Sequence, residues 1–134
     1  MLEKLLLGII TLLHILVILF VLLAPFSNSN YILMLHAIFV PFLIFHWITN
    51  NNTCCLTVAE KAIRKSSGTP DEAVEDNCFT CKLIEPIYDF KNNYESMSTI
   101  IYVITIALWL ISVGKLYMKY HRGEISSWSS LFMY

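Results

Sequence analysis

Four cysteines are the residues of this chain with the clearest capacity for chemistry, and all lie in one stretch between two apolar runs: Cys54, Cys55, Cys78 and Cys81. Cys78 and Cys81 are one helical turn apart, so on a helix both side chains face the same way. Three interpretations stay open: disulfides that join the two pairs of positions, reduced thiols packed as small apolar groups, and a redox-active or zinc-binding pair. Because adjacent cysteines seldom bind one metal ion, Cys54 and Cys55 make a poor second half of a zinc site, and we expect no metal and no cofactor.

Six polar residues recur at intervals of four, three, four, three and four: His46, Asn50, Thr53, Thr57, Glu60 and Arg64. This spacing predicts that a helix continues from the second apolar run into an amphipathic extension that ends near Lys65, with all six side chains on one face. Glu60 and Arg64 form an i,i+4 pair in the favourable order. We name these six residues the polar stripe, and we expect it to be the face that a partner binds.

Three further polar residues lie inside apolar runs, where polar groups are functional candidates: His14, His36 and Thr105. In a hairpin of the first two runs His14 lies level with Pro41, so His36 and His46 are each offset from it by about 7.5 Å, which argues against haem held by two histidines. We expect neutral imidazoles that form hydrogen bonds between helices. The third run carries polar side chains at similar spacing, and we expect these to form a packing seam rather than a conduit: Ser98, Tyr102, Thr105, Trp109 and Ser112.

Three apolar runs, at residues 5–24, 31–48 and 98–114, must position these side chains, and none of the runs contains Asp, Glu, Lys or Arg. A helix of roughly 20 apolar residues is long enough to cross the hydrocarbon of a bilayer. We predict an all-α membrane protein with transmembrane helices at residues 1–24, 31–48 and 98–118. We also predict a turn at 25–30, an extramembrane helical segment with the four cysteines at 49–97, and an interfacial tail at 119–134.

Composition supports the membrane class, because 57% of the 134 residues are hydrophobic and only 14% are charged. The net charge of −1 provides no basic face for nucleic acid. The first run is longer than the apolar core of a signal peptide, and Ala24-Pro25 is a poor cleavage site, so we expect an uncleaved first span. The distribution of Lys and Arg favours a cytosolic segment at 49–97, whereas disulfides favour the oxidising side, and the sidedness stays open.

Residues 46–57 (HWITNNNTCCLT), followed by Glu60 and Arg64, resemble a recurrent segment of small multi-span membrane proteins encoded by large eukaryotic DNA viruses. Phe79 and residues 84–90 (IEPIYDF) resemble a second segment of that family, and the resemblance covers residues 31–95. It carries over no established activity. It implies a viral membrane or a virion as the location, and a viral thiol oxidase as a source of disulfides on the cytosolic side.

We therefore expect a structural multi-pass membrane protein, in a viral or virus-modified membrane, that presents a compact helical segment to a protein partner. The expected partner is a capsid component or another membrane protein, with the lipid bilayer as solvent and a homo-oligomer left open. Enzymatic activity is not expected, because the sequence contains no nucleophile–base pair and no phosphate loop. Two alternatives stay open: a membrane thiol–disulfide redox protein that uses Cys78 and Cys81, and a small oligomeric pore.

Overall fold

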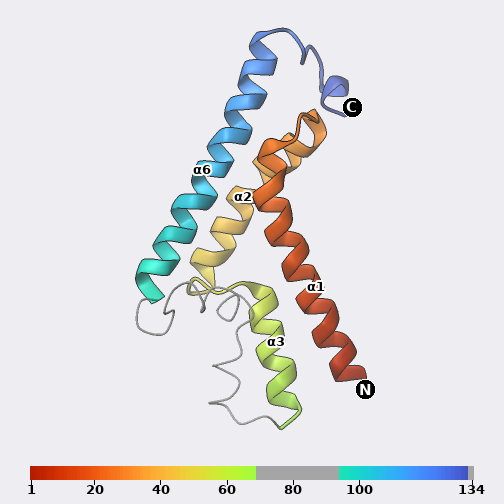
Figure 1. Ribbon diagram of the computed structural model, residues 1–134, viewed down its shortest axis with the longest axis vertical. Helices are drawn as coiled ribbons and strands as arrows, with labels where there is room; N and C mark the ends of the chain where they lie inside the picture. The colour runs from red at the N-terminus through yellow and green to blue at the C-terminus, as the bar shows by residue number, and fades with distance from the viewer. Residues whose placement is uncertain (69–93, 133–134) are drawn as a thin grey trace. The chain divides into compact units, whose positions relative to one another are not determined.

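The computed structural model describes residues 1–68 and 94–132 (Figure 1). This part of the chain is helical and contains no strand. In chain order its elements are α1 (Leu2–Leu23), the 3-10 turn η1 (Ala24–Phe26), α2 (Asn30–Thr49), α3 (Cys55–Ser66), α6 (Tyr94–His121) and the 3-10 turn η2 (Trp128–Leu131). Cys78 and Cys81 lie outside the described residues.

Three helical stretches are long and apolar enough to cross a membrane: Leu2–Phe26, Asn30–Thr49 and Ser98–His121. They confirm the coarse prediction of an all-helical chain with three such helices, as in a multi-pass membrane protein. Many large apolar side chains of α1 are exposed, among them Leu5, Leu12 and Leu19. A helix that is apolar on all sides and exposes these side chains is suited to contact with lipid.

The chain divides into two compact units. Unit 1 consists of residues 1–16 and 46–99, and unit 2 consists of residues 17–45 and 100–134. The helices α1, α2 and α6 each give residues to both units, whereas α3 belongs to unit 1 and η2 to unit 2.

The predicted continuous helix from the second apolar run to Lys65 is wrong. α2 ends at Thr49, and α3 begins at Cys55 after a turn. Asn51 and Asn52 have φ angles of 51° and 61°, and the Asn52 N–H donates to the Trp47 carbonyl oxygen at 2.7 Å. Asparagine tolerates this left-handed conformation better than most residues, and such a backbone bond closes the last turn of a helix. The polar stripe is therefore divided between two helices and a turn.

Candidate functional site

His36 joins three helices in unit 2. Its side chain is fully buried, its Nε2 lies 3.1 Å from the Val21 carbonyl oxygen on α1, and its Nδ1 lies 2.8 Å from the Ser112 hydroxyl on α6. A carbonyl oxygen only accepts, so Nε2 carries a proton, and in the neutral imidazole Nδ1 accepts from Ser112. The predicted hydrogen bonds between helices are present at this residue, and the neutral state of the imidazole stays a prediction.

The Val21 carbonyl needs this donor because of its place in α1. In an α-helix it accepts from the N–H four residues later, and that residue is Pro25, which has no N–H. A carbonyl oxygen without a donor in an apolar environment carries a large desolvation cost. His36 supplies the missing donor from α2.

Trp109 repeats this arrangement on α2. Its indole Nε1–H donates to the Ala37 carbonyl oxygen at 2.9 Å. The helical donor for that carbonyl is four residues later at Pro41, which again has no N–H. Pro25 in η1 and Pro41 in α2 thus each free one carbonyl, and a polar side chain of another helix satisfies it.

The predicted packing seam on the third run is confirmed for its C-terminal half. Thr105 and Ser112 are buried, and Trp109 and Ser112 both bond to α2. Ser98 instead donates to the Glu95 carbonyl oxygen of its own helix at 3.0 Å. The seam in unit 2 therefore serves helix packing.

Two lysines of α6 hold the turn between α1 and α2. Lys115 donates to the Ser27 carbonyl oxygen at 3.3 Å. Lys119 donates to the Asn28 carbonyl oxygen and, at 2.7 Å, to Asn30 Oδ1. All of these acceptors are neutral, so the contacts fix the turn without cancelling the charge of either lysine.

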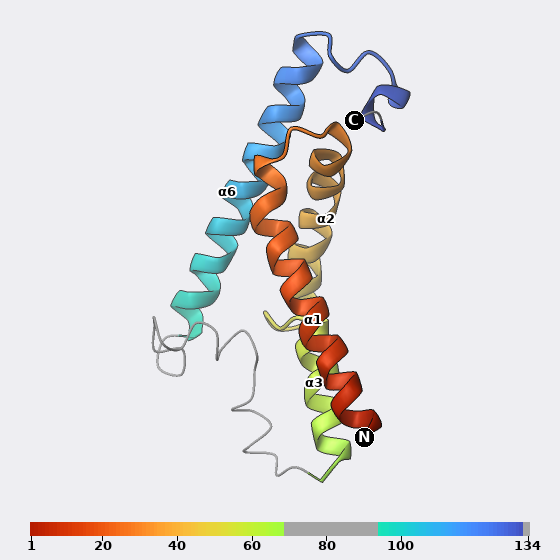
Figure 2. The same cartoon turned by 45° about the vertical axis from the view of Figure 1, so that its right-hand side comes forward.

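In unit 1 the polar side of α3 faces α1. Thr57 and Glu60 are 4% and 3% exposed, and the Thr57 hydroxyl lies 3.4 Å from His14 Nε2. Both views of the molecule show α3 alongside the N-terminal part of α1 (Figures 1 and 2). Within unit 1, α3 therefore packs against α1 at the level of His14, and the extramembrane location of residues 49–97 stays a prediction.

The prediction that the polar stripe is the face offered to a partner is wrong for Thr57 and Glu60, because unit 1 buries both of them. A partner face requires these side chains to be accessible, whereas Thr57 and Glu60 are 4% and 3% exposed. Here His14 gives α1 a polar position against which the polar side of α3 can pack.

Glu60 is the buried charge of this site. Its Oε1 accepts two bonds from the Arg64 guanidinium, at 3.0 and 3.2 Å. Its Oε2 is buried and accepts a hydrogen bond from no residue in the described part of the chain. The ion pair predicted from the i,i+4 spacing is confirmed; its carboxylate is buried, and its guanidinium is partly exposed.

The first three residues of the polar stripe form the joint between α2 and α3. His46 Nε2 accepts the backbone N–H of Cys55 at 2.9 Å, at the first residue of α3. The Asn50 side-chain amide donates to the His46 carbonyl oxygen at 2.9 Å, and the Thr53 hydroxyl donates to the Asn51 carbonyl oxygen at 3.4 Å. His46 thus satisfies one of the backbone donors that the start of a helix leaves open.

Cys54 and Cys55, at the start of α3, form no disulfide with a residue in the described part of the chain. Cys55 is exposed, whereas Cys54 is partly buried, and this burial raises the pKa of the Cys54 thiol. A raised pKa disfavours the thiolate that nucleophilic and redox chemistry requires. A bridge to Cys78 or Cys81 stays a prediction, because both partners lie outside the described residues. Among the described residues no group of three or more His, Cys, Asp or Glu side chains could hold a metal ion.

One family of proteins matches residues 4–114 of the chain, and it is described as Protein of Unknown function (DUF2784). The matched range is more than half of the chain. The chain belongs to this family. In this DUF2784 member the matched range includes His14, Glu60, His36 and Trp109, so both polar arrangements lie within it. Neither the curated proteins nor the solved structures contain a match.

Sequence reasoning named His36 and missed the reason for its position. The available signal was a proline four residues after a carbonyl inside an apolar helix, since it marks a carbonyl that requires an outside donor. This signal identifies Val21 and Ala37 from the sequence alone. It does not identify the donor, which depends on how the helices pack.

Proposed function

We propose that the protein is a non-enzymatic, multi-pass membrane protein that holds α3 in a fixed position for binding by another protein. The observation that carries the proposal is the burial of Thr57 and Glu60, through which α3 is attached by its polar side. The opposite side of the helix stays accessible, with Cys55, Val58 and Lys65 exposed. An amphipathic helix attached in this way offers a mixed apolar and basic surface.

The contacts at both ends of the attachment support this role. His46 fixes the first turn of α3, and Arg64, in its last turn, pairs with Glu60. The polar side chains of unit 2 are likewise engaged in bonds between helices, as at His36 and Trp109. Polar groups used in this way support a rigid scaffold.

The accessible side of α3 suits a partner with acidic groups. The second half of the helix contains three basic residues, Lys61, Arg64 and Lys65, and Arg64 pairs with Glu60. Charge complementarity of this kind directs a partner to one orientation and raises the rate of association. We propose a protein with an acidic surface as the partner; a capsid component and another membrane protein are both proposals of this class.

A photoreactive amino acid at Val58 tests the proposal in the membrane of the cell that makes the protein. Val58 is 48% exposed, and Leu12 on α1, at 56%, is the matched control position. We expect a discrete protein adduct at Val58 that is absent at Leu12 and is lost when Lys61 and Lys65 are both changed to Glu. Equal adducts at the two positions, or adducts with lipid alone, overturn the proposal.

The other predicted functions stay predictions. The thiol–disulfide redox function depends on Cys78 and Cys81, outside the described residues. For the small oligomeric pore, no contact in the described part of the chain supports the prediction. A virion or a virus-modified membrane as the location is a proposal that rests on the resemblance of residues 46–57 and 84–90.

A further inference from the structure

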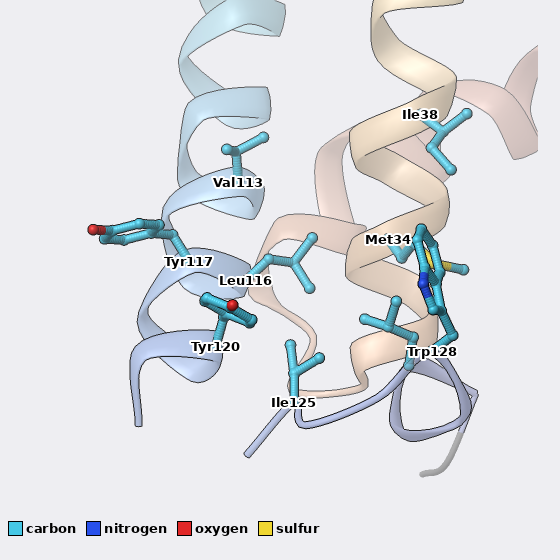
Figure 3. A pocket seen from close by; sticks show the side chains of 9 residues that line it. Met34, Ile38, Val113, Leu116, Tyr117, Tyr120, Ile125 and Trp128 are labelled. Carbon is cyan, nitrogen blue, oxygen red and sulfur yellow. The ribbon is translucent and has the colours of Figure 1, made fainter. Parts of the chain in front are cut away.

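Unit 2 contains an open apolar groove of about 410 Å³. Met34 and Ile38 of α2 line one side, Leu116 and Tyr120 of α6 line another, and Trp128 of the tail completes it (Figure 3). The lining is almost wholly apolar, so a polar solute finds few partners in it. An apolar chain loses no hydrogen bonds on entering such a groove.

The tail wall of this groove is held in place by contacts to the start of α2. The Asn30 side-chain amide donates to the Ser130 carbonyl oxygen at 3.3 Å. The rings of Tyr31 and Phe132 lie 5.9 Å apart. Within η2, Ser127 and Ser130 form a reciprocal capping box. The groove is therefore formed by tertiary contacts that bring the tail to α2.

The charges of unit 2 lie in the C-terminal part of α6 and in the tail. Residues 17–45 contain no Asp, Glu, Lys or Arg, whereas α6 and the tail contribute Lys115, Lys119, Arg122 and Glu124. Within the described residues of unit 2 none of the three cations forms an ion pair, and Lys115 and Lys119 bond only to neutral oxygens. Arg122 is exposed two residues after Tyr120, which lines the groove. Lys119 bonds to the same Asn30 side chain that holds Ser130 of the tail, so positive charge lies at the tail end of the groove.

We propose that this groove binds one acyl chain of an anionic phospholipid, with the phosphate near Arg122 and Lys119. The chain treats lipid as its solvent over three helices, so acyl chains have direct access to an apolar groove on α2 and α6. Tyr120 and Trp128, which are 67% and 82% exposed, have the amphipathic rings that favour the membrane interface. Basic side chains at this level attract anionic headgroups over zwitterionic ones. The proposal is independent of the function proposed for α3.

Native mass spectrometry of the full-length protein in detergent tests the proposal, with phosphatidylglycerol and phosphatidylcholine of identical acyl chains as probes. We expect one phosphatidylglycerol to bind roughly 25-fold more tightly than phosphatidylcholine, because Arg122 and Lys119 are each expected to contribute about fivefold. Arg122→Gln lowers this preference about fivefold, the effect of one basic side chain. The matched control is Lys4→Gln, an exposed cation of unit 1, which leaves the preference unchanged.

A second variant separates the acyl chain from the headgroup. Ile38→Trp fills the groove from a side chain that is 65% exposed, so the helix packing tolerates it, and the variant is expected to lose tight binding of both lipids. Equal affinity for the two lipids overturns the proposal, as does binding that Ile38→Trp leaves intact. A stoichiometric dimer that masks the groove and excludes lipid also overturns it, because a second copy of the chain is then the occupant.

Discussion

The Ser112 hydroxyl donates to His36 Nδ1 at 2.8 Å, and this contact orients the imidazole so that its other nitrogen reaches α1. The hydroxyl fixes the tautomer, because a ring nitrogen that accepts from Ser112 leaves the proton on Nε2. That proton goes to the carbonyl that Pro25 deprives of its helical donor. The three contributions, from α6, α2 and α1, form one chain of hydrogen bonds in which the removal of any member leaves a buried polar group unpaired.

His36→Leu is expected to destabilise the protein by about 1–3 kcal/mol, because the Val21 carbonyl and the Ser112 hydroxyl both lose their partner. The measurement is reversible unfolding in mixed micelles. His121→Leu is the control, since His121 is exposed at the end of α6, and its expected effect is below about 0.5 kcal/mol. Equal effects of the two substitutions contradict the role assigned to His36.

Trp109→Phe is expected to cost about 1–2 kcal/mol, because it leaves the Ala37 carbonyl without a donor. Pro41→Ala restores an N–H that can bond to the same carbonyl, so Trp109→Phe loses most of its effect in that background. A double-mutant cycle in unfolding experiments measures this coupling. If the two substitutions are additive, Trp109 does not serve as the substitute donor for Pro41.

How far the sequence predicts this structure depends on whether a feature is local. Roughly 20 residues without charge predict a spanning helix whatever surrounds them, and α1, α2 and α6 confirm this. The i,i+4 spacing likewise predicted the pair of Glu60 and Arg64. The prediction that the polar side of α3 faces a partner was wrong for Thr57 and Glu60, because the orientation of this side depends on His14 in another helix.

The break between α2 and α3 could not be predicted from spacing either. The polar stripe keeps a helical period across residues 50–54, so periodicity alone favours a continuous helix. The break depends on two asparagines in the left-handed conformation and on the bond from Cys55 to His46, which forms only after the chain turns back. Three consecutive asparagines at 50–52 were the available local signal.

Asn51→Val is expected to destabilise unit 1 by about 1–2 kcal/mol, because a β-branched residue resists the φ angle of 51° at this position. Asn51→Gly adopts the same conformation without strain and serves as the matched control, with an effect within about 0.5 kcal/mol. Limited proteolysis in the turn reports the difference as faster cleavage of the valine variant. Equal cleavage of both variants shows that the turn conformation does not limit stability.

Arg64→Met is expected to cost about 1–3 kcal/mol, because it leaves the Glu60 carboxylate buried without its cation. The 30% exposure of the Arg64 side chain places the value at the lower part of the range for buried pairs. The double variant Glu60→Gln with Arg64→Met removes both charges and is expected to recover most of the loss. If the double variant is as unstable as Arg64→Met, the packing of the arginine and not its charge stabilises α3.

Alkylation of the two adjacent thiols is expected to separate with pH in the reduced protein. Burial raises the pKa of Cys54, so its thiolate forms at higher pH than in an ordinary thiol, whereas Cys55 is exposed to the reagent. At neutral pH we expect Cys55 to react several-fold faster, and the rate at Cys54 to keep rising into the alkaline range. Two variants, each retaining either Cys54 or Cys55 in a background of Cys78→Ser and Cys81→Ser, assign each alkylation rate to one position.

The same pKa shift has a consequence for stability, and its sign follows from linkage. The raised pKa means that the folded state holds the Cys54 proton more tightly than the unfolded state. At a pH above the ordinary thiol pKa, the folded state therefore retains more protons than the unfolded state does. Folding stability therefore falls in that alkaline window and is unaffected below it. Cys54→Ala removes this alkaline loss while Cys55→Ala preserves it, and unfolding measured at neutral and alkaline pH compares the two. An alkaline loss that survives in Cys54→Ala assigns the effect to another group, and the burial of Cys54 then has no part in it.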